Sequence, residues 1–160
     1  TGDGETVGLI TYMRTDSTNV SPLAQQEARD YVVEVHGARF VPEESPRHKT
    51  RSKGAQEAHE AVRPTSVLRT PKQVKEHLSR DQYRLYQLIW KRFVASQMSP
   101  AVFDTLTVTV KGQTELHEYT LRSSGSALKF AGFLVVYEET KGKSDAEEIN
   151  CEIADIAADL

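Results

Sequence analysis

Apolar residues recur at helical spacing through much of the first hundred positions of the chain. The Ser-Pro pair at 21–22 is typical of a helix start and Gly37 of a helix end, so the pattern predicts a helix over 22–36. A short helix is expected from 71 to about 78 and the longest over 80–97, each after a capping Thr or Ser. The apolar stripe of the first helix consists of Ala24, Ala28, Tyr31, Val32 and Val35. That of the longest helix consists of Tyr83, Tyr86, Ile89, Trp90, Phe93 and Val94.

Other segments of the same region follow different patterns. The apolar run over 7–12, VGLITY, predicts one short buried strand ahead of the helices. Residues 41–54 contain two prolines and several basic residues, which predicts an exposed loop. A short helix is expected over 55–61, where alanines recur.

After Pro100 the hydrophobic period changes to two, which predicts antiparallel strands. Three strands are expected over 103–110, 116–121 and 128–137, with a turn at Lys111-Gly112 after the first. The final residues carry a capping-box spacing from Ser144 and predict a last helix. The chain is therefore predicted to have an α+β fold, mostly helical at first and then antiparallel β.

Charge changes sign at the same boundary. Residues 1–99 carry 15 Lys and Arg against 12 Asp and Glu, whereas residues 100–160 carry 5 against 11. We therefore expect two domains with this boundary, the first suited to an anionic partner. A chain that is 38% hydrophobic and 27% charged is neither fibrous nor wholly disordered.

Three features predict where the protein works. No apolar run approaches the roughly 18 residues that span a bilayer, so no membrane partner is expected. The single cysteine, Cys151, forms no internal disulfide or two-cysteine zinc site, which favours the cytoplasm. The start, without Met or a basic leader, indicates a soluble piece of a longer protein.

The densest group of reactive side chains follows the first predicted strand and consists of Tyr12, Arg14, Thr15, Asp16, Ser17 and Thr18. In an extended chain, Tyr12, Arg14 and Asp16 project to the same side. A phenol with a pKa of about 10 is a poor nucleophile at pH 7, and a guanidinium beside it favours the phenolate and binds phosphate. The group is thus suited to attack on a phosphodiester. In the alternative interpretation, Tyr12 ends a core strand and Arg14 pairs with Asp16 at the surface.

A second group lies in the predicted helix over 55–61, where His59 and Arg63 are four residues apart. His59 is a candidate to donate a hydrogen bond to a phosphate or to position a carboxylate, and the alternative is a partly buried histidine with a structural bond. With Glu60 alone it offers too few ligands for a metal. The basic run over 47–53 is a candidate contact to a DNA backbone or simply solvated surface. The sequence allows two interpretations of Tyr83, Tyr86 and Trp90. They form either a core stripe, which is favoured, or a platform on which DNA bases stack.

Three blocks of the sequence resemble the type IA DNA topoisomerases, in the order that this family has them. GLITYMRTDSTNVS at 8–21 resembles the family's active-site signature, and the Met between Tyr and Arg is similar to its bacterial branch. AQEAHEAVRPT at 55–65 is similar to a second block and LYQLIWKRFVASQMSPAVFDT at 85–105 to a third. The resemblance covers some 100 residues, and the last twenty or so match no block.

The resemblance implies a fold and an activity. Residues 1–99 would be the tyrosine-bearing domain that opens the strand gate, likened to helix-turn-helix domains, and 100–160 an incomplete part of a β-rich arch. Tyr12 would attack one strand of single-stranded DNA to form a 5′-phosphotyrosine, and strand passage would then relax negative supercoils without ATP. Arg14 would hold the phosphate and His59 would assist. DNA-binding roles would fall to Thr15, Asp16, Ser17, Thr18 and Arg63, with Arg63 alternatively a structural ion-pair partner.

The resemblance also implies partners. Magnesium would be bound by an acidic cluster in another domain of the same polypeptide, which this chain has no segment to match, so the chain itself is expected to bind no metal. The chain alone is therefore expected not to relax supercoils. The complete enzyme is expected to act in the cytoplasm, on the nucleoid. The alternatives are a non-catalytic helical DNA-binding module and a degenerate interaction domain that keeps the signature.

Overall fold

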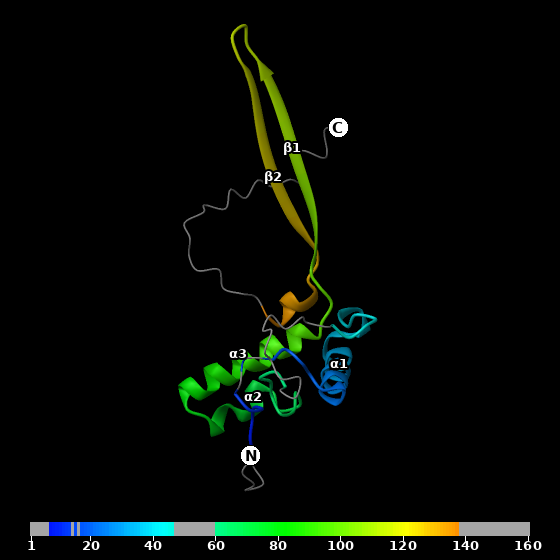
Figure 1. The fold of residues 1–160 in the computed structure, drawn as a ribbon, viewed down its shortest axis with the longest axis vertical. Helices are drawn as coiled ribbons and strands as arrows, with labels where there is room; N and C mark the ends of the chain where they lie inside the picture. The colour runs from blue at the N-terminus through cyan, green and yellow to red at the C-terminus, as the bar shows by residue number, and fades with distance from the viewer. Residues whose placement is uncertain (1–6, 14, 16, 47–59, 138–160) are drawn as a thin grey trace. The chain divides into compact units, whose positions relative to one another are not determined.

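The structure is a computed structural model that describes residues 7–13, 15, 17–46 and 60–137. In this part of the chain, residues up to 100 together with 132–137 form one compact unit, and residues 101–131 form another. The first unit contains helices α1, Pro22–His36, α2, Pro71–Val74, and α3, Arg80–Ser96, and the second contains strands β1, Val102–Gln113, and β2, Glu118–Phe130 (Figure 1). The predicted α+β class is confirmed.

Local capping signals determine where α1 begins and ends. The Ser21 Oγ accepts from the Ala24 N–H at 3.4 Å, and Pro22 occupies the first helical position. Gly37 ends the helix at φ 97°, and its N–H donates to the carbonyls of Val32 and Val33. The predicted range over 22–36 is confirmed, although Val35 of the predicted stripe is 53% exposed.

Reciprocal side-chain bonds start the later helices. The Thr70 N–H donates to the Gln73 Oε1 at 2.8 Å ahead of α2, which continues as a 3-10 helix over Lys75–His77. At α3, the Ser79 Oγ accepts from the Gln82 N–H at 3.3 Å while the Gln82 Oε1 accepts from the Ser79 N–H at 3.0 Å. Both predicted helices are therefore confirmed, the first with a 3-10 end.

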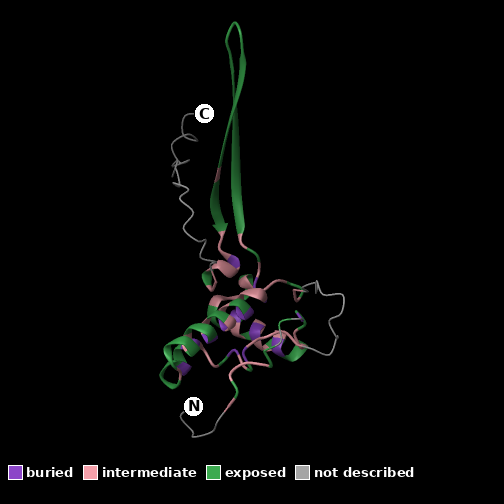
Figure 2. Ribbon diagram, turned by 60° about the vertical axis from the view of Figure 1, so that its left-hand side comes forward, coloured by how far each residue is buried: buried purple, intermediate pink, exposed green. Residues whose placement is uncertain are grey.

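Trp90 of α3 is buried in the core of the helical unit. The buried positions gather in this unit (Figure 2). The Trp90 Nε1–H donates to the Val67 carbonyl at 3.0 Å, and the Trp90 ring meets Tyr31 edge to face with centroids 5.5 Å apart. The Tyr86 hydroxyl donates to the Arg69 carbonyl at 2.6 Å. Tyr86 and Trp90 are thus core residues and offer no base-stacking platform. The buried hydrophobic residues are Ala24, Ala28, Val32, Val67, Val74, Tyr86, Trp90, Phe93, Val94 and Met98.

The β unit differs from the prediction of three strands. β1 pairs with β2 in one antiparallel register from Gln113↔Glu118 down to Phe103↔Leu128. The turn lies at 114–117, where the Thr114 N–H donates to the His117 carbonyl at 2.8 Å, and not at Lys111-Gly112. Pairing along the whole hairpin carries β2 through the Ser-Gly run at 123–126, which has weak strand propensity and lies between two of the predicted strands.

The third predicted strand, over 128–137, is wrong beyond Phe130, where β2 ends, because the chain bends at Gly132. This residue has φ +49°, and a Cβ here would lie 2.5 Å from backbone atoms of Ser99 and Pro100. A 3-10 helix follows over Gly132–Val135, and the Phe133 N–H donates to the Ser99 carbonyl at 3.0 Å. Only glycine fits so close to this backbone, so the segment folds onto the helical unit.

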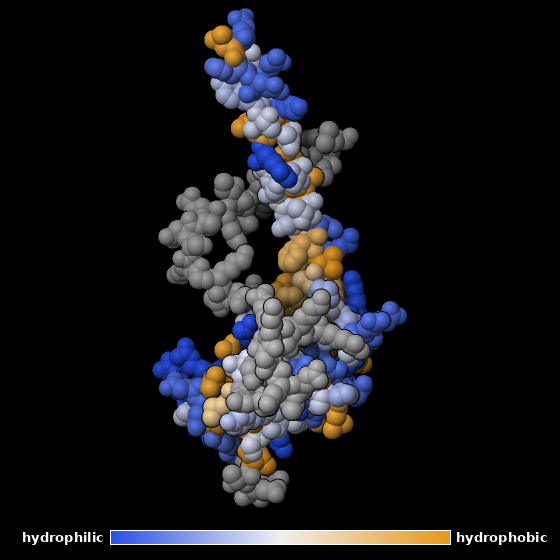
Figure 3. Space-filling model, viewed as in Figure 1, coloured by the Kyte–Doolittle hydropathy of each residue, from blue (hydrophilic) through white to orange (hydrophobic). Residues whose placement is uncertain are grey.

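The hairpin exposes both of its faces within the described residues. The register places Leu106, Val108, Val110 and Leu121 on one face and the threonines of β1 on the other, and all are exposed. Apolar side chains reach the surface along this hairpin (Figure 3). A two-stranded hairpin is marginally stable without further packing. The alternation of this segment therefore indicates an apolar face that is not covered by the described residues.

Several expectations fall wholly or partly outside the described residues. The last predicted helix, Cys151, the basic run over 47–53 and most of the helix over 55–61 lie there. Glu60 and Ala61 are described and are not helical, so that helix does not extend to 61. Among the residues that the structure places, no helix is both long and apolar enough to cross a membrane.

Candidate active site

Tyr12 leaves a short paired segment and extends into solvent. Ile10 forms an isolated antiparallel bridge with Pro64, and two backbone bonds flank it, from the Thr11 N–H to the Arg63 carbonyl at 2.9 Å and from the Thr65 N–H to the Leu9 carbonyl at 3.0 Å. The predicted buried strand is thus only a half-buried bridge, because pairing stops after Thr11. Tyr12, the next residue, is 75% exposed.

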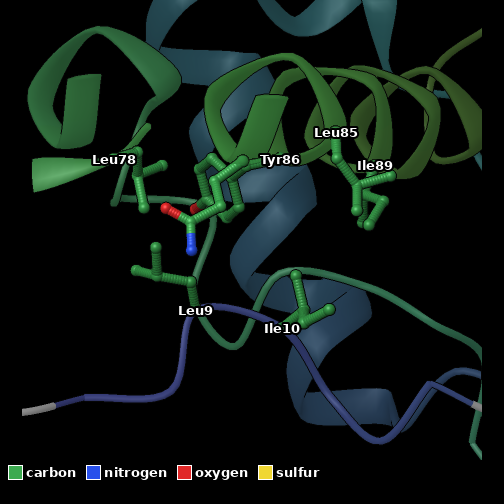
Figure 4. Close-up of a pocket in the computed structure, with 7 residues that line it drawn as sticks. Leu9, Ile10, Leu78, Leu85, Tyr86 and Ile89 are labelled. Carbon is green, nitrogen blue, oxygen red and sulfur yellow. The ribbon is translucent and has the colours of Figure 1, made fainter. Parts of the chain in front are cut away.

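Apolar packing holds the segment before Tyr12 against the helical unit. Leu9 and Ile10 line one side of an open pocket of about 280 Å³, opposite residues of α3 (Figure 4). The other lining residues are Leu78, Gln82, Leu85, Tyr86 and Ile89. Leu9 and Ile10 anchor the chain, and the largely apolar lining is not suited to phosphate chemistry.

Residues 60–63, which we call the clamp segment, hold both ends of the loop that carries Tyr12. At the first end, the Thr11 Oγ1 donates to the Ala61 carbonyl at 3.0 Å and accepts from the Arg63 N–H at 3.0 Å. At the other end, the Ala61 N–H donates to the Asn19 carbonyl at 2.7 Å, and the Ser21 N–H donates to the Glu60 Oε1 at 2.9 Å. The Tyr12 loop is therefore closed by four consecutive residues from a distant part of the sequence.

A salt bridge orders the clamp segment. The Arg63 Nε donates to the Glu60 Oε1 at 2.8 Å and the Nη2 to the Oε2 at 3.1 Å, while the Nη1 donates to the Pro64 carbonyl at 2.9 Å. Burial raises the pKa of Glu60, but the bonds from Arg63 and from the Ser21 N–H outweigh it, and the pKa lies below its ordinary value of 4.5. The Arg63 side chain is 12% exposed and that of Glu60 32%. Both side chains are thus committed to shaping the site.

We expect Glu60→Gln to destabilise the helical unit by about 1–2 kcal/mol at pH 7, since it leaves the Arg63 charge unpaired in a half-buried place. A lowered folded pKa contributes stability above the ordinary value, which is lost as the pH falls through the folded pKa. The difference between wild type and variant should therefore shrink in acid. Urea denaturation followed by the fluorescence of Trp90, the one tryptophan, measures this.

Asp30→Asn is the matched control, because the Asp30 carboxylate is exposed on α1 and accepts a surface bond from the Gln26 Nε2 at 2.8 Å. It should change the free energy of unfolding by less than about 0.5 kcal/mol. An equal effect of the two substitutions, or a Glu60→Gln effect that does not depend on pH, would contradict the role of the Glu60–Arg63 pair.

The residues predicted for the site divide into three groups. Thr15 and Thr18 lie exposed in the Tyr12 loop, and Ser17 is 6% exposed, with its Oγ accepting from the Asn19 N–H at 3.1 Å. Arg63 meets Glu60, as in its ion-pair interpretation. Arg14, Asp16 and His59 lie outside the described residues.

Sequence reasoning missed two residues. Thr11 was counted only as part of a strand, and Glu60 only as an insufficient metal ligand. The three-residue spacing of Glu60 and Arg63 was a signal for their pairing, whereas nothing local indicates that Thr11 meets a segment 50 residues away.

The residues that the structure describes do not fit a magnesium site. Within 7–13, 15, 17–46 and 60–137, no group of three or more His, Cys, Asp or Glu side chains is placed to hold a metal ion. Glu60, the acidic residue that faces the Tyr12 loop from the clamp segment, is occupied by Arg63 and Ser21. No chemical step is therefore assigned to a metal bound by these residues.

Comparison with known proteins gives the class to which this fold and site belong. The model of the DNA topoisomerase family matches residues 5–158, so the chain belongs to that family. It is similar to the bacterial type I enzymes: DNA topoisomerase 1 of Xylella fastidiosa, in strains Temecula1 and 9a5c, is 49% identical over 147 residues, which are 92% of this chain. Full-length topoisomerase I from Thermotoga maritima matches with a TM-score of 0.67 and 38% identity over 89% of this chain.

The match covers only part of each relative. It corresponds to 18% of the Xylella proteins and 22% of the Thermotoga chain, so this chain spans about a fifth of their length. Three blocks at 8–21, 55–65 and 85–105 suggested the family from the sequence, and the match over nearly the whole chain confirms it.

Proposed function

We propose that this chain supplies the nucleophilic tyrosine of a type IA DNA topoisomerase, and that Tyr12 is this residue. The observation that carries the proposal is the placement of Tyr12, 75% exposed in a loop whose two ends are fixed by the clamp segment. A nucleophile for a polymeric substrate must be accessible and held in place at once. Membership in the DNA topoisomerase family supports DNA as the substrate.

In the proposed reaction, the Tyr12 phenol attacks a backbone phosphorus of single-stranded DNA. The Tyr Oη–P bond forms as the P–O3′ bond breaks, the phenolic proton is given up, and the leaving O3′ takes up a proton to become a 3′-hydroxyl. The product is a 5′-phosphotyrosine. Attack by the 3′-hydroxyl reverses each change, so the strand is rejoined without ATP because one phosphodiester has replaced another.

Other residues take supporting roles in this proposal. Arg14 holds the scissile phosphate with a bidentate guanidinium and stabilises its charge in the transition state, and His59 assists. Thr15, Asp16 and Thr18 contact DNA or these side chains. The buried Ser17 and the paired Arg63 shape the loop, which their observed contacts support.

At the level of the complete polypeptide, we propose strand passage through the cleaved strand and relaxation of negative supercoils. The names of the Xylella and Thermotoga relatives support this activity. Magnesium and the remaining domains belong to that proposal as partners of the chain. Residues 1–160 alone are expected to leave a supercoiled plasmid unrelaxed, because in this proposal the magnesium is bound by another domain of the polypeptide.

The polarity of covalent capture tests the proposal. The full polypeptide that carries this sequence is mixed with single-stranded DNA labelled at either its 3′ or its 5′ end, with magnesium present, and is then denatured. We expect label on the protein only from the 3′-labelled DNA, because the protein retains the fragment downstream of the break. Label only from 5′-labelled DNA, or none from either, would exclude a 5′-phosphotyrosine.

A further inference from the structure

Thr11 ends the paired backbone one residue before Tyr12. Its N–H donates to the Arg63 carbonyl at 2.9 Å, but the Arg63 N–H donates to the Thr11 Oγ1, at 3.0 Å. In a continuing antiparallel pair, that N–H would donate to the Thr11 carbonyl. The hydroxyl thus takes the place that the backbone carbonyl of the same residue would occupy.

The same hydroxyl is engaged as a donor. Its Oγ1 lies 3.0 Å from the Ala61 carbonyl and 3.4 Å from that of Arg63. A hydroxyl that donates and accepts at once has its rotamer fixed. Thr11 is half-buried whereas Tyr12 is 75% exposed, so the chain turns from pairing to solvent at this residue.

The clamp segment that Thr11 contacts is itself held in place. The Glu60–Arg63 salt bridge orders it, and the Ser21 N–H ties Glu60 to the start of α1. The Ala61 backbone contacts both loop ends, through the Thr11 hydroxyl and the Asn19 carbonyl. The hydroxyl therefore binds a surface that the rest of the helical unit fixes.

We propose that Thr11 is a positioning residue for Tyr12: by accepting the Arg63 N–H, its hydroxyl stops the pairing and directs the phenol to the place where DNA is cleaved. This inference rests on the proposed function of Tyr12. It assigns to Thr11 no contact with DNA, and its effect is on the rate of the covalent step.

Thr11→Val and Thr11→Ser separate the hydroxyl from the shape of the side chain. Valine keeps the branched shape but leaves the Arg63 N–H to find the backbone carbonyl of residue 11, which extends the pairing toward Tyr12 and moves the phenol. Serine keeps the hydroxyl and both of its bonds. Because a misplacement of about 1 Å can cost about 100-fold in rate, we expect Thr11→Val to slow covalent capture at least about tenfold.

The experiment measures single-turnover capture of 3′-labelled single-stranded DNA by the full polypeptide that carries this sequence. Thr11→Ser should restore capture to within about threefold of wild type. The affinity for DNA, measured for each substitution in a Tyr12→Phe background, should change by less than about twofold, because Thr11 makes no DNA contact.

Thr65→Val is the matched control. Its Oγ1 donates to the Gly8 carbonyl at 2.7 Å, so the change removes a hydroxyl bond from the same pair of segments, farther from Tyr12. It should leave the capture rate within about twofold of wild type. Capture slowed equally by Thr65→Val and Thr11→Val would show a merely structural effect and overturn the inference.

The remaining outcomes distinguish the two claims. Wild-type capture that is lost in Tyr12→Phe but unchanged in Thr11→Val would overturn the positioning role alone. Failure of Thr11→Ser to restore capture would do the same, because the role would then not belong to the hydroxyl. Capture that persists in Tyr12→Phe would contradict the proposed function, and with it the positioning of Tyr12.

Discussion

Replacing Tyr12 by phenylalanine should abolish covalent capture of DNA, by at least about a thousandfold, while leaving the fold intact. The substitution removes only the phenolic oxygen, which is the nucleophile in the proposed reaction, so the covalent step has no substitute. The side chain is 75% exposed, and the free energy of unfolding should change by less than about 0.5 kcal/mol. Capture of labelled DNA and urea denaturation measure the two effects.

Non-covalent binding of DNA by the same variant separates an enzyme from a binding module. If Tyr12 is the nucleophile, Tyr12→Phe should bind single-stranded DNA as wild type does and never become attached to it. Met13→Leu is a control in the same loop, since Met13 is also exposed, and it should capture DNA at nearly the wild-type rate. Equal capture by Tyr12→Phe and wild type would show that another residue is the nucleophile.

Replacing Trp90 by alanine should destabilise the helical unit by about 3–5 kcal/mol, the usual cost of removing a large aromatic side chain from a core. Trp90 is 7% exposed, contacts Tyr31 edge to face, and donates to the Val67 carbonyl. The variant loses these contacts and leaves a buried carbonyl without its donor. Such a loss approaches the total stability of many small domains.

Leu88→Ala on the same helix is the control for Trp90→Ala, because Leu88 is 45% exposed and should cost less than about 1 kcal/mol. Far-UV circular dichroism follows urea denaturation of both variants, since Trp90→Ala removes the fluorescent probe. A loss below about 1 kcal/mol for Trp90→Ala would mean that this helix is not packed as the structure has it.

The helices could be predicted because their signals are local. Ser21 starts α1 and Gly37 ends it, each through bonds to residues within five positions, and the Ser79–Gln82 pair starts α3 in the same way as Ser21 starts α1. The core stripe of α3 follows from helical period alone. These features need no knowledge of what lies elsewhere in the chain.

The hairpin and the bridge could not be predicted in full because their partners are distant. Ser-Gly positions at 123–126 have weak strand propensity but are held by pairing with β1, including a 3.0 Å contact between the hydroxyls of Thr107 and Ser124. The bend at Gly132 depends on the close backbone of Ser99 and Pro100. The alternation of apolar and polar residues along a strand reveals neither the pairing partner nor the backbone that lies close to Gly132.

In the candidate site, too, local features could be predicted from the sequence and contacts between distant segments could not. Tyr12 stood out in the sequence by its reactive neighbours, and the two blocks at 8–21 and 55–65 by their resemblance to one family. What sequence reasoning lacked was the physical link between these blocks, in which the clamp segment holds the Tyr12 loop through Thr11 and Asn19. Contacts across 40 to 50 residues arise from the tertiary fold.

Direct identification of the attached residue tests the central claim. The full polypeptide that carries this sequence is captured on single-stranded DNA, digested with nuclease and protease, and its peptides are examined by mass spectrometry. We predict one modified peptide, with a 5′-linked nucleotide on the Tyr12 oxygen. A nucleotide on any other residue, or no covalent adduct under conditions in which the polypeptide binds DNA, would contradict the assignment of Tyr12 as the nucleophile.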